Sequence, residues 1–326
     1  MTTIVPSAPG PDPTGGRPGL PPRAVTGRGP ARSRYGRAER RLAAFLVGPS
    51  MLLIALVAAY PIGYAIWLSL HEYSRRVPGL SRFAGLDNYS AALAGGFWGA
   101  LGNTLVFTVT SVALELVIGL GMALAMHHAF RGRGILRATV LVPWATITAV
   151  TAITWRTIFE PGLGLAPQLL AKIGVAENVV WLGERGYAMA VLVLADVWKT
   201  APFMALLLLA GLQVISDDVY EAARVDGASA RQRFVYITLP LLAPAMLVAL
   251  IFRTLDALRV FDLPAVLTDG SNGTTVLSLL AYQELTRNQL VGLGAALSVL
   301  TFVVVMLVSF LYIRFVGGNI RTLGED

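Results

Sequence analysis

The sequence contains no cysteine, only three histidines and few charged residues, and each shortage excludes a class of function. Without cysteine there is no disulfide, no thiolate nucleophile and no cysteine-based zinc site. Three histidines leave little from which to build a metal cluster, so we expect no metal chemistry. Only two lysines occur, neither of them in a Gly-Lys-Ser/Thr phosphate loop, and no G-x-G-x-x-G motif is present. The chain is therefore predicted to lack an ATP site of its own.

Apolar residues, by contrast, are abundant. The chain has 326 residues, of which 55% are hydrophobic and 14% are charged, whereas soluble domains carry about 25% charged residues. The apolar residues gather in blocks that are each long enough to cross a hydrocarbon core of about 30 Å. These blocks are 42–70, 101–128, 135–158, 188–212, 239–267 and 291–316. We predict an all-α integral membrane protein with six transmembrane helices that form one domain at 42–316.

Basic residues predict the orientation of this domain. Residues 1–41 are rich in Pro, Gly and Arg, hold eight of the 26 basic residues, and are predicted to be a disordered cytoplasmic tail. The tail is too long, and the apolar block after it too extended, for a signal peptide. With the N-terminus inside, the inner segments hold sixteen basic residues and the outer loops six. Both termini, including a short tail at 317–326, are therefore predicted to be cytoplasmic.

One inner loop, residues 216–240, has strong local signals for two short helices joined by a turn. Ser216 is placed to cap the first helix, and Gly227 to end it, because glycine tolerates the left-handed conformation found at helix C-termini. Ser229 and Gln232 have the spacing of a capping box that starts the second helix, and Leu239-Pro240 opens the next span. The residues alone leave two interpretations open: a well-capped connection, or a rigid knob that transmits movement to the membrane spans.

Charged residues also occur within the predicted spans, where each one costs about 2.5 to 3.5 kcal/mol if it faces lipid. We therefore expect them to face the interior of the bundle or a wet cavity. Asp196 with Lys199, and Arg253 with Asp256, are three residues apart, so each pair is predicted to neutralise itself on one helical face. Arg253 and Asp256 are placed near the midplane, the depth at which transporters bind substrates. The alternative is that these charges only lock helices together or face a partner subunit. The charged residues are Glu115, Asp196, Lys199, Arg253, Asp256 and Arg259.

The run Glu221-Ala222-Ala223, followed by Gly227 and by Leu239-Pro240, resembles the EAA loop of ABC importer permeases of the sugar-importer type, which includes maltose and trehalose permeases. The resemblance extends from residue 42 to residue 316. Residues 253–262 are especially similar to actinobacterial trehalose-type permeases. One departure is 268–273, where the family usually has a second glycine after the threonine, and this segment belongs to an outer loop.

The resemblance implies a multi-pass permease subunit of an ATP-driven importer in the bacterial cell membrane, and not an enzyme. The implied substrate is a disaccharide or small oligosaccharide of the trehalose/maltose type. The implied partners are a second permease, two ATPase subunits that bind ATP and Mg, and an extracellular solute-binding (lipo)protein, while this chain binds no cofactor and no nucleic acid. The implied ATPase-coupling residues are Glu221, Ala222, Ala223, Asp226 and Gly227. The implied sugar-contacting residues are Lys199, Thr200, Phe203, Arg253, Asp256, Ala257 and Val260.

Two other functions are weighed against this one. An ion-coupled secondary transporter would use intramembrane acids such as Glu115 and Asp256 to carry protons, but it leaves the 216–240 loop unexplained. An integral membrane enzyme would need a nucleophile elbow, a metal cluster or paired catalytic acids, and the sequence has none of these patterns.

Overall fold

A computed structural model describes residues 36–76, 79, 81–127, 133–174 and 179–315, and the described chain is mostly helical. Both predicted tails lie largely outside these residues, although residues 36–41 already belong to the first helix. The chain divides into two compact units, residues 1–57 and 58–326. Helix α1 (Gly36–Ser69) supplies all that is described of the first unit and the start of the second.

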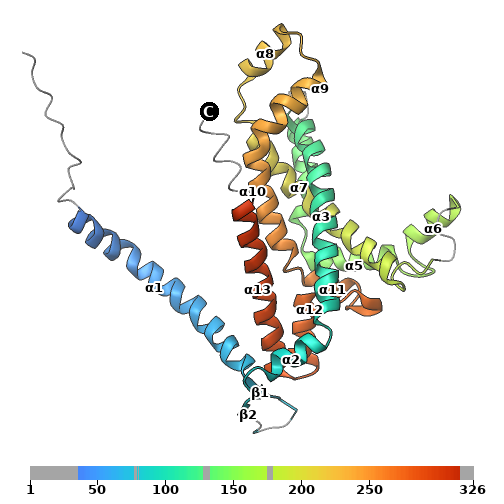
Figure 1. Cartoon of the computed structure of the whole chain (residues 1–326). Coiled ribbons are helices and arrows are strands. Elements are labelled where there is room, and N and C mark those ends of the chain that lie inside the picture. The colour runs from blue at the N-terminus through green and yellow to red at the C-terminus, as the bar shows by residue number, and fades with distance from the viewer. Residues whose placement is uncertain (1–35, 77–78, 80, 128–132, 175–178, 316–326) are drawn as a thin grey trace, which may run out of the picture. The chain divides into compact units, whose positions relative to one another are not determined.

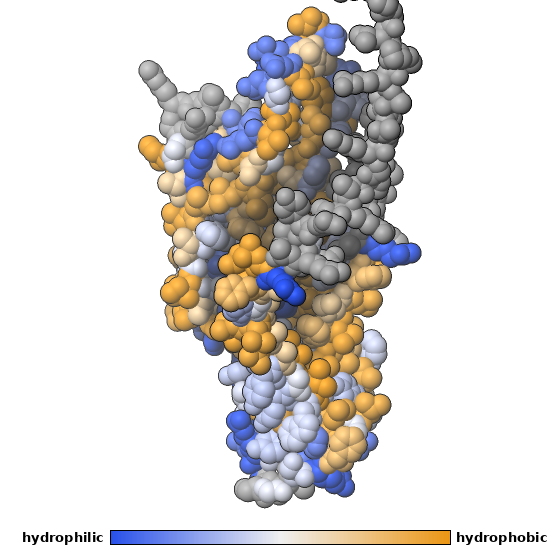
Figure 2. All heavy atoms as spheres, turned by 90° about the vertical axis from the view of Figure 1, so that its left-hand side faces the viewer, coloured by the Kyte–Doolittle hydropathy of each residue, from blue (hydrophilic) through white to orange (hydrophobic). Residues whose placement is uncertain are grey.

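The second unit is built on four long helices. These are α3 (Phe97–His127), α7 (Arg185–Leu212), α10 (Leu239–Ala257) and α13 (Val291–Phe315). Among the described residues, five helices are long and apolar enough to cross a membrane, or six if a bent pair is counted as one span. The predicted all-α class is therefore confirmed. Figure 2 shows hydrophilic residues gathered at the two ends of the visible face and hydrophobic residues between them.

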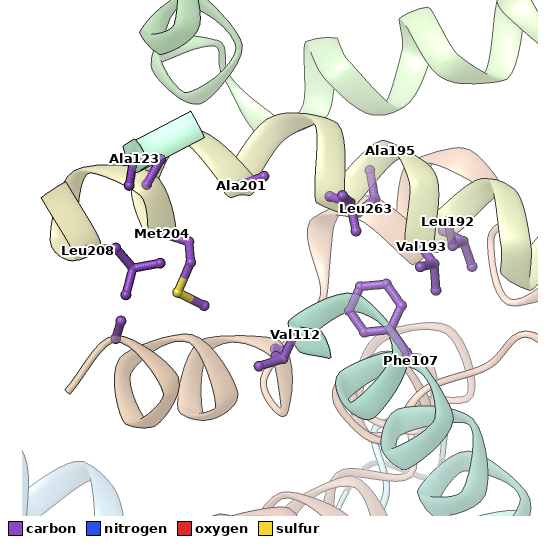
Figure 3. Close-up of a cluster of buried hydrophobic side chains, with 14 of the residues drawn as sticks. Phe107, Val112, Ala123, Leu192, Val193, Ala195, Ala201, Met204, Leu208 and Leu263 are labelled. Carbon is purple, nitrogen blue, oxygen red and sulfur yellow. The ribbon is translucent and has the colours of Figure 1, made fainter. Parts of the chain in front are cut away.

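Small residues allow α7 to lie close to two neighbouring helices. A Cβ added to Gly119 on α3 would lie 2.8 Å from Met204 Cγ on α7. A Cβ on Gly211 of α7 would lie 2.4 Å from Ala245 Cβ on α10. Packing of this kind replaces the hydrophobic driving force that helices lack inside lipid. Around these contacts lies a buried apolar cluster, in which Figure 3 labels Phe107 and Val112 with residues of α7 and α11.

The third predicted span, 135–158, is not one straight helix. It consists of α4 (Arg133–Ala145) and α5 (Thr148–Ile158), which meet at an angle of 89°. Pro143 lies inside α4 and cannot donate a backbone hydrogen bond, which weakens the last turn. Beyond the last turn, the Thr146 hydroxyl donates to the Pro143 carbonyl at 2.6 Å and lies 2.9 Å from the Thr151 hydroxyl, so side chains hold the bend.

The fifth predicted span, 239–267, also breaks. α10 ends at Ala257, and a short helix, α11 (Asp262–Leu267), follows a four-residue turn. Pro264 explains why the helix does not continue. Proline has no N–H, so in a continuing helix the carbonyl four residues earlier would lack its hydrogen bond. In the first turn of a new helix the N–H groups have no such partner, and proline is tolerated there. At its other end α10 runs on without a break from α9 (Ala230–Arg233) and the π-helical turn η1 (Phe234–Thr238).

Shorter elements connect the long helices. Strands β1 (His71–Tyr73) and β2 (Ser81–Phe83) form an antiparallel hairpin with His71 opposite Phe83. The remaining elements are α2 (Asp87–Ala94), α6 (Leu165–Lys172), α8 (Asp217–Val225), η2 (Ser271–Gly273), α12 (Leu277–Tyr282) and η3 (Gln283–Arg287). Figure 1 shows α8 and α9 together at one end of α3, α7 and α10.

Candidate substrate site and coupling loop

The 216–240 segment, which we call the knob, forms two short helices joined by a turn, as the sequence predicts. The Asp218 N–H donates to Ser216 Oγ at 3.3 Å, so Ser216 caps α8, and Asp217 and Asp218 occupy the positive end of the helix dipole. At the start of α9, the Gln232 N–H donates to Ser229 Oγ at 3.3 Å and the Ser229 N–H donates to Gln232 Oε1 at 2.8 Å. Both predicted caps are thus confirmed, and they satisfy donors that would otherwise need water.

Gly227 ends α8 for the predicted reason. Its φ is +79°, in the left-handed region, and its N–H donates to the Arg224 carbonyl at 3.1 Å. The next residue, Ala228, donates its N–H to the Ala223 carbonyl at 2.9 Å, which closes the helix end. No atom outside the neighbouring residues lies within 4 Å of a Cβ added at Gly227. The backbone angle alone therefore requires glycine here, since there is space for a side chain.

The knob is joined to the membrane helix without slack. The Leu239 N–H donates to the Phe234 carbonyl, five residues back, and this wider turn accommodates Pro240, which has no N–H. The Tyr220 hydroxyl on α8 lies 3.1 Å from the Thr238 hydroxyl at the base of α10. Of the predicted coupling residues, Glu221, Ala222, Asp226 and Gly227 are exposed and Ala223 is buried. Two of the predicted coupling residues, Glu221 and Asp226, are therefore exposed carboxylates on a tethered support.

A second feature, the charge network, lies where α3, α7 and α10 meet, and Arg253 is its centre. Only 3% of the Arg253 side chain is exposed. Its Nε donates to Glu115 Oε2 at 2.5 Å and its Nη2 to Glu115 Oε1 at 2.9 Å. Nη2 also donates to Asp196, and Nη1 donates to Asp256 Oδ2 at 2.8 Å. Each nitrogen of the guanidinium is therefore engaged by a carboxylate from this chain.

This network departs in part from the predicted pairing. The Arg253–Asp256 pair is confirmed, but the predicted Asp196–Lys199 pair is wrong, because Asp196 turns toward Arg253. The buried guanidinium attracts that carboxylate in a low-dielectric interior, whereas a lysine on the surface of the same helix gains little. Glu115, whose role the sequence leaves open, is fully buried and also accepts a hydrogen bond from Thr200 Oγ1 at 2.6 Å.

The other predicted sugar-contacting residues lie along this network with different exposure. The Asp256 side chain is 70% exposed, so it is the member of the network that faces outward. Lys199, Thr200, Phe203 and Val260 are half-buried, whereas Ala257 is only 1% exposed. On α7, Asp196, Lys199 and Phe203 recur at helical spacing and share a face. Whether these residues contact a sugar stays a prediction.

One residue beside this face was not predicted to belong to it. Trp144, near the end of α4, stacks on Phe203 with ring centroids 5.7 Å apart and an angle of 12° between the planes. The Lys199 ammonium lies 3.5 Å from the Trp144 carbonyl oxygen and donates to it. The sequence analysis had no signal for this contact, because it depends on the bend between α4 and α5.

A separate cavity of about 570 Å³ opens beside the turn that follows α10. It includes none of the predicted sugar-contacting residues, and its lining is largely apolar. The lining residues are Arg259, Phe261, Ser278, Ala281, Tyr282, Leu285, Ser298, Thr301, Phe302 and Val305.

The outer segment 268–273, where the sequence departs from the resembling family, is tied to two elements, α3 and η3. Asn103 on α3 donates to the carbonyls of Gly273 and Thr275 at 2.8 and 2.7 Å. Asp269, with a φ of +53°, accepts two hydrogen bonds from Arg287 at 2.8 and 2.6 Å. These bonds from the guanidinium lower the pKa of the Asp269 carboxyl. The 268–273 segment thus has a defined conformation, which includes the Asp269–Arg287 ion pair.

Known proteins resemble the chain over most of its length. Residues 116–318 match the family model described as "Binding-protein-dependent transport system inner membrane component". The trehalose transport system permease protein SugA of Mycobacterium tuberculosis is 45% identical over 281 residues, which cover 86% of this chain and 90% of that protein. The trehalose/maltose transport system permease protein MalF of Thermococcus litoralis is 44% identical over 279 residues, or 85% and 94% of the two chains.

A solved structure matches the fold. It is a chain of a bacterial alginate ABC transporter in complex with an alginate pentasaccharide-bound periplasmic protein. The two chains superpose with a TM-score of 0.72, and the match covers 86% of this chain and 96% of that one at 20% identity. At this identity the likeness establishes the fold alone.

Proposed function

The chain belongs to the family of binding-protein-dependent transport system inner membrane components, and we propose that it is a permease subunit that imports a disaccharide with energy from a separate ATPase. It is a multi-pass membrane protein of a transport system. The observation that carries the coupling half of this proposal is the tethered knob at 216–240. The relatives named for trehalose and maltose, together with the residues around Asp256, support the substrate half.

The knob suits the transfer of a push between an ATPase and the membrane helices. One end follows α7 after residues 213–215, the other continues without a break into α10, and the Tyr220–Thr238 hydrogen bond ties α8 to the base of α10. Movement of α8 would therefore displace α10, whose last turn carries Arg253 and Asp256. We propose that Glu221, Ala222, Ala223, Asp226 and Gly227 dock on an ATPase subunit, and that ATP and Mg are bound there.

The charge network suits a site for a neutral, polar substrate. Arg253 is held by Glu115 and Asp196, and it in turn holds the exposed Asp256 in place. A carboxylate oriented in this way accepts hydrogen bonds from sugar hydroxyls, and the Lys199 ammonium donates to them. Because the guanidinium is already engaged, we propose that Arg253 positions Asp256 and that Asp256 makes the contact.

The proposed cycle requires no chemistry in this subunit. A solute-binding protein delivers the sugar to a cavity formed with a second permease, and ATP-driven movement of the knobs turns the cavity from one side of the membrane to the other. The chain makes and breaks no covalent bond. The ion-coupled alternative is less favoured, because it leaves the knob at 216–240 unexplained and because one of its two candidate acids, Glu115, is fully buried and bound to Arg253.

The test is uptake of labelled trehalose into proteoliposomes that contain the complete importer. The solute-binding protein is supplied on the side of the membrane from which the sugar is taken up. We expect uptake to depend on ATP and to survive an ionophore. Asp256→Asn removes charge-assisted hydrogen bonds worth about 1.5 to 3 kcal/mol, so transport per assembled complex should fall roughly 10- to 100-fold. Arg253 keeps Glu115 and Asp196 in this variant, so assembly should be normal.

Asp87→Asn, an exposed aspartate at the start of α2, is the matched control and should transport at the wild-type rate. Uptake that persists without ATPase subunits and collapses with an ionophore would show an ion-coupled transporter instead. If Asp256→Asn lowers only the yield of complex, and the surviving complexes transport normally, then the network is a structural lock.

A further inference from the structure

The cavity of about 570 Å³ beside the turn that follows α10 lies apart from the residues of the proposed sugar site. Its walls come from that turn, from α12 with η3, and from α13. The volume is within the range of pockets that bind small molecules. Figure 1 shows α12 at the end of the second unit opposite to α8 and α9, so the cavity lies on the outer side of the membrane.

The walls of this cavity offer little to a ligand that needs hydrogen bonds. The rings of Phe261 and Tyr282 meet edge to face with centroids 5.0 Å apart, and Phe302 lines the cavity from α13. Ser298 and Thr301, also on α13, donate their hydroxyl hydrogens to the carbonyls four residues earlier in the same helix, at 2.9 and 2.8 Å. A sugar in this cavity would leave most of its hydroxyl groups unpaired, whereas a hydrocarbon chain has none to pair.

Arg259 places a positive charge at the opening of the cavity. Among the described residues that line the cavity it is the only charged one, and it is exposed. Within the described part of the chain its guanidinium makes one hydrogen bond, from Nε to the Leu255 carbonyl, and no ion pair. Nη1 and Nη2 therefore have no partner among these residues and can donate to a ligand.

The depth of the cavity in the membrane fits a lipid. Arg259 is about 30 Å along the helix axis from Leu239, where α10 begins, so it lies at the outer edge of a hydrocarbon core of about 30 Å. On α13, which begins at Val291, the lining residues from Ser298 to Val305 lie about 10 to 20 Å from the outer end. The cavity thus extends from the level of the lipid phosphates toward the middle of the membrane, which is the direction of an acyl chain.

We propose that this cavity binds an anionic phospholipid of the outer leaflet, with its phosphate on Arg259 and one acyl chain between α12 and α13. A guanidinium binds phosphate through two parallel hydrogen bonds, and both terminal nitrogens of Arg259 are available for them. A positive charge with no carboxylate among the described lining residues favours a headgroup of net negative charge over a zwitterionic one. The lipid site is separate from the sugar site, so it does not depend on which solute the permease carries.

The test is thermal denaturation of the complete importer, purified in detergent and depleted of lipid, with added phosphatidylglycerol or phosphatidylcholine. A lipid that binds the folded complex raises the denaturation temperature by an amount that grows with its affinity, so phosphatidylglycerol should raise it more. Arg259→Gln should lower the apparent affinity for phosphatidylglycerol about 5-fold and remove the preference for the anionic lipid. Without added lipid, this variant should denature at the wild-type temperature.

Arg156→Gln is the matched control. Arg156 is also an exposed arginine that donates to a backbone carbonyl, that of Val266 at 3.5 Å, but it does not line the cavity. This variant should keep both the affinity and the preference of wild type. Ser298→Leu places a larger side chain in the cavity and should weaken the binding of both lipids. Glycerol phosphate, which has a phosphate and no acyl chain, should not raise the denaturation temperature.

Equal stabilisation of wild type by the two lipids, or a preference that persists in Arg259→Gln, would overturn the lipid site. Glycerol phosphate that stabilises wild type as much as phosphatidylglycerol would show an anion site in which the cavity has no part. If neither lipid binds and Ser298→Leu lowers the yield of assembled complex, the second permease fills the cavity, which also excludes a lipid there. If Ser298→Leu does not assemble, Arg259→Gln still decides the question, because Arg259 is exposed. Trehalose uptake by the same preparation tests the proposed function separately.

Discussion

Replacement of Arg253 by methionine should destabilise the helix bundle more than any other single change in the charge network. Methionine keeps an unbranched side chain as far as the ε position but removes the guanidinium whose charge Glu115 and Asp196 share. Among the described residues these two carboxylates have no other ion-pair partner, and Glu115 is fully buried. Removal of one partner from a buried ion pair costs about 3 to 5 kcal/mol, because the remaining charge stays in a low-dielectric interior.

Second substitutions that remove the carboxylates left without a partner test the same explanation. Glu115→Gln in the Arg253→Met background removes one orphaned charge, and Asp196→Asn removes the second, so stability should recover stepwise. Residues in one network usually show coupling energies of about 0.5 to 3 kcal/mol. The measurement is thermal denaturation of the purified complex in detergent at pH 7, together with the yield of assembled complex.

Arg259→Met provides the control for Arg253→Met. Arg259 is exposed, and within the described part of the chain its side chain makes one hydrogen bond, from Nε to the Leu255 carbonyl at 3.1 Å. Its loss should therefore change the denaturation temperature little. Equal destabilisation by the two variants, or a further loss of stability when Glu115→Gln is added to Arg253→Met, would refute the assignment of Arg253 as the charge that holds three helices together.

Two further predictions concern packing and the outer loop. Gly211→Ala should destabilise the complex by about 1 to 3 kcal/mol in thermal denaturation, because the new Cβ would lie 2.4 Å from Ala245 Cβ. Gly121→Ala on α3 is the control. Its Cβ would meet no atom within 4 Å, so this variant should be as stable as wild type or more stable. The lowered pKa of Asp269 means that its ion pair contributes stability above the ordinary aspartate pKa of about 3.9 and loses it as the pH falls through the lowered value. Wild type should thus be slightly more stable than Asp269→Asn at pH 6, and a difference that does not shrink as the pH falls below about 3.9 would contradict the ion-pair explanation.

The sequence predicts a helix well where residues close together in the chain determine it. Long apolar runs located the spans within about six residues, except that the fifth ends early, at Ala257. The caps at Ser216 and Ser229 were correct because a cap involves neighbours two or three residues apart. The bend at residues 146–147 was missed. Pro143 is visible in the sequence, but the hydroxyl bonds that turn a weak point into an 89° bend join residues on both sides of it.

The charge network shows the same limit. Spacing predicted Arg253 with Asp256, since both lie on one helical turn, and also predicted Asp196 with Lys199, which the structure does not form. The pair Arg253–Glu115 joins residues 138 positions apart. No pattern within one helix indicates which of several buried acids will meet an arginine on another, because the answer depends on how α3, α7 and α10 pack.

Substitutions at Gly227 test the coupling loop in graded steps. The backbone angle at this position disfavours other residues, whereas the space around it does not. Its φ of +79° is strained for an ordinary residue, while a Cβ there would meet nothing within 4 Å. Alanine should cost about 1 kcal/mol from the backbone alone, and asparagine less, since it visits the left-handed region more readily. Proline fixes φ near −65° and removes the N–H that bonds to the Arg224 carbonyl, so it cannot form this turn.

Sugar imported per ATP hydrolysed, measured on assembled complexes, should therefore fall in the order asparagine, alanine, proline, with the proline variant uncoupled. The thermal stability of the membrane helices should hardly change, because Gly227 is exposed and lies beyond their ends. Gly162→Pro is the control, since Gly162 also has a positive φ, of +80°, and open space around it, but lies on the loop between α5 and α6. If alanine couples better than asparagine, the size of the side chain against a docked partner sets the requirement, and the turn at Gly227 does not.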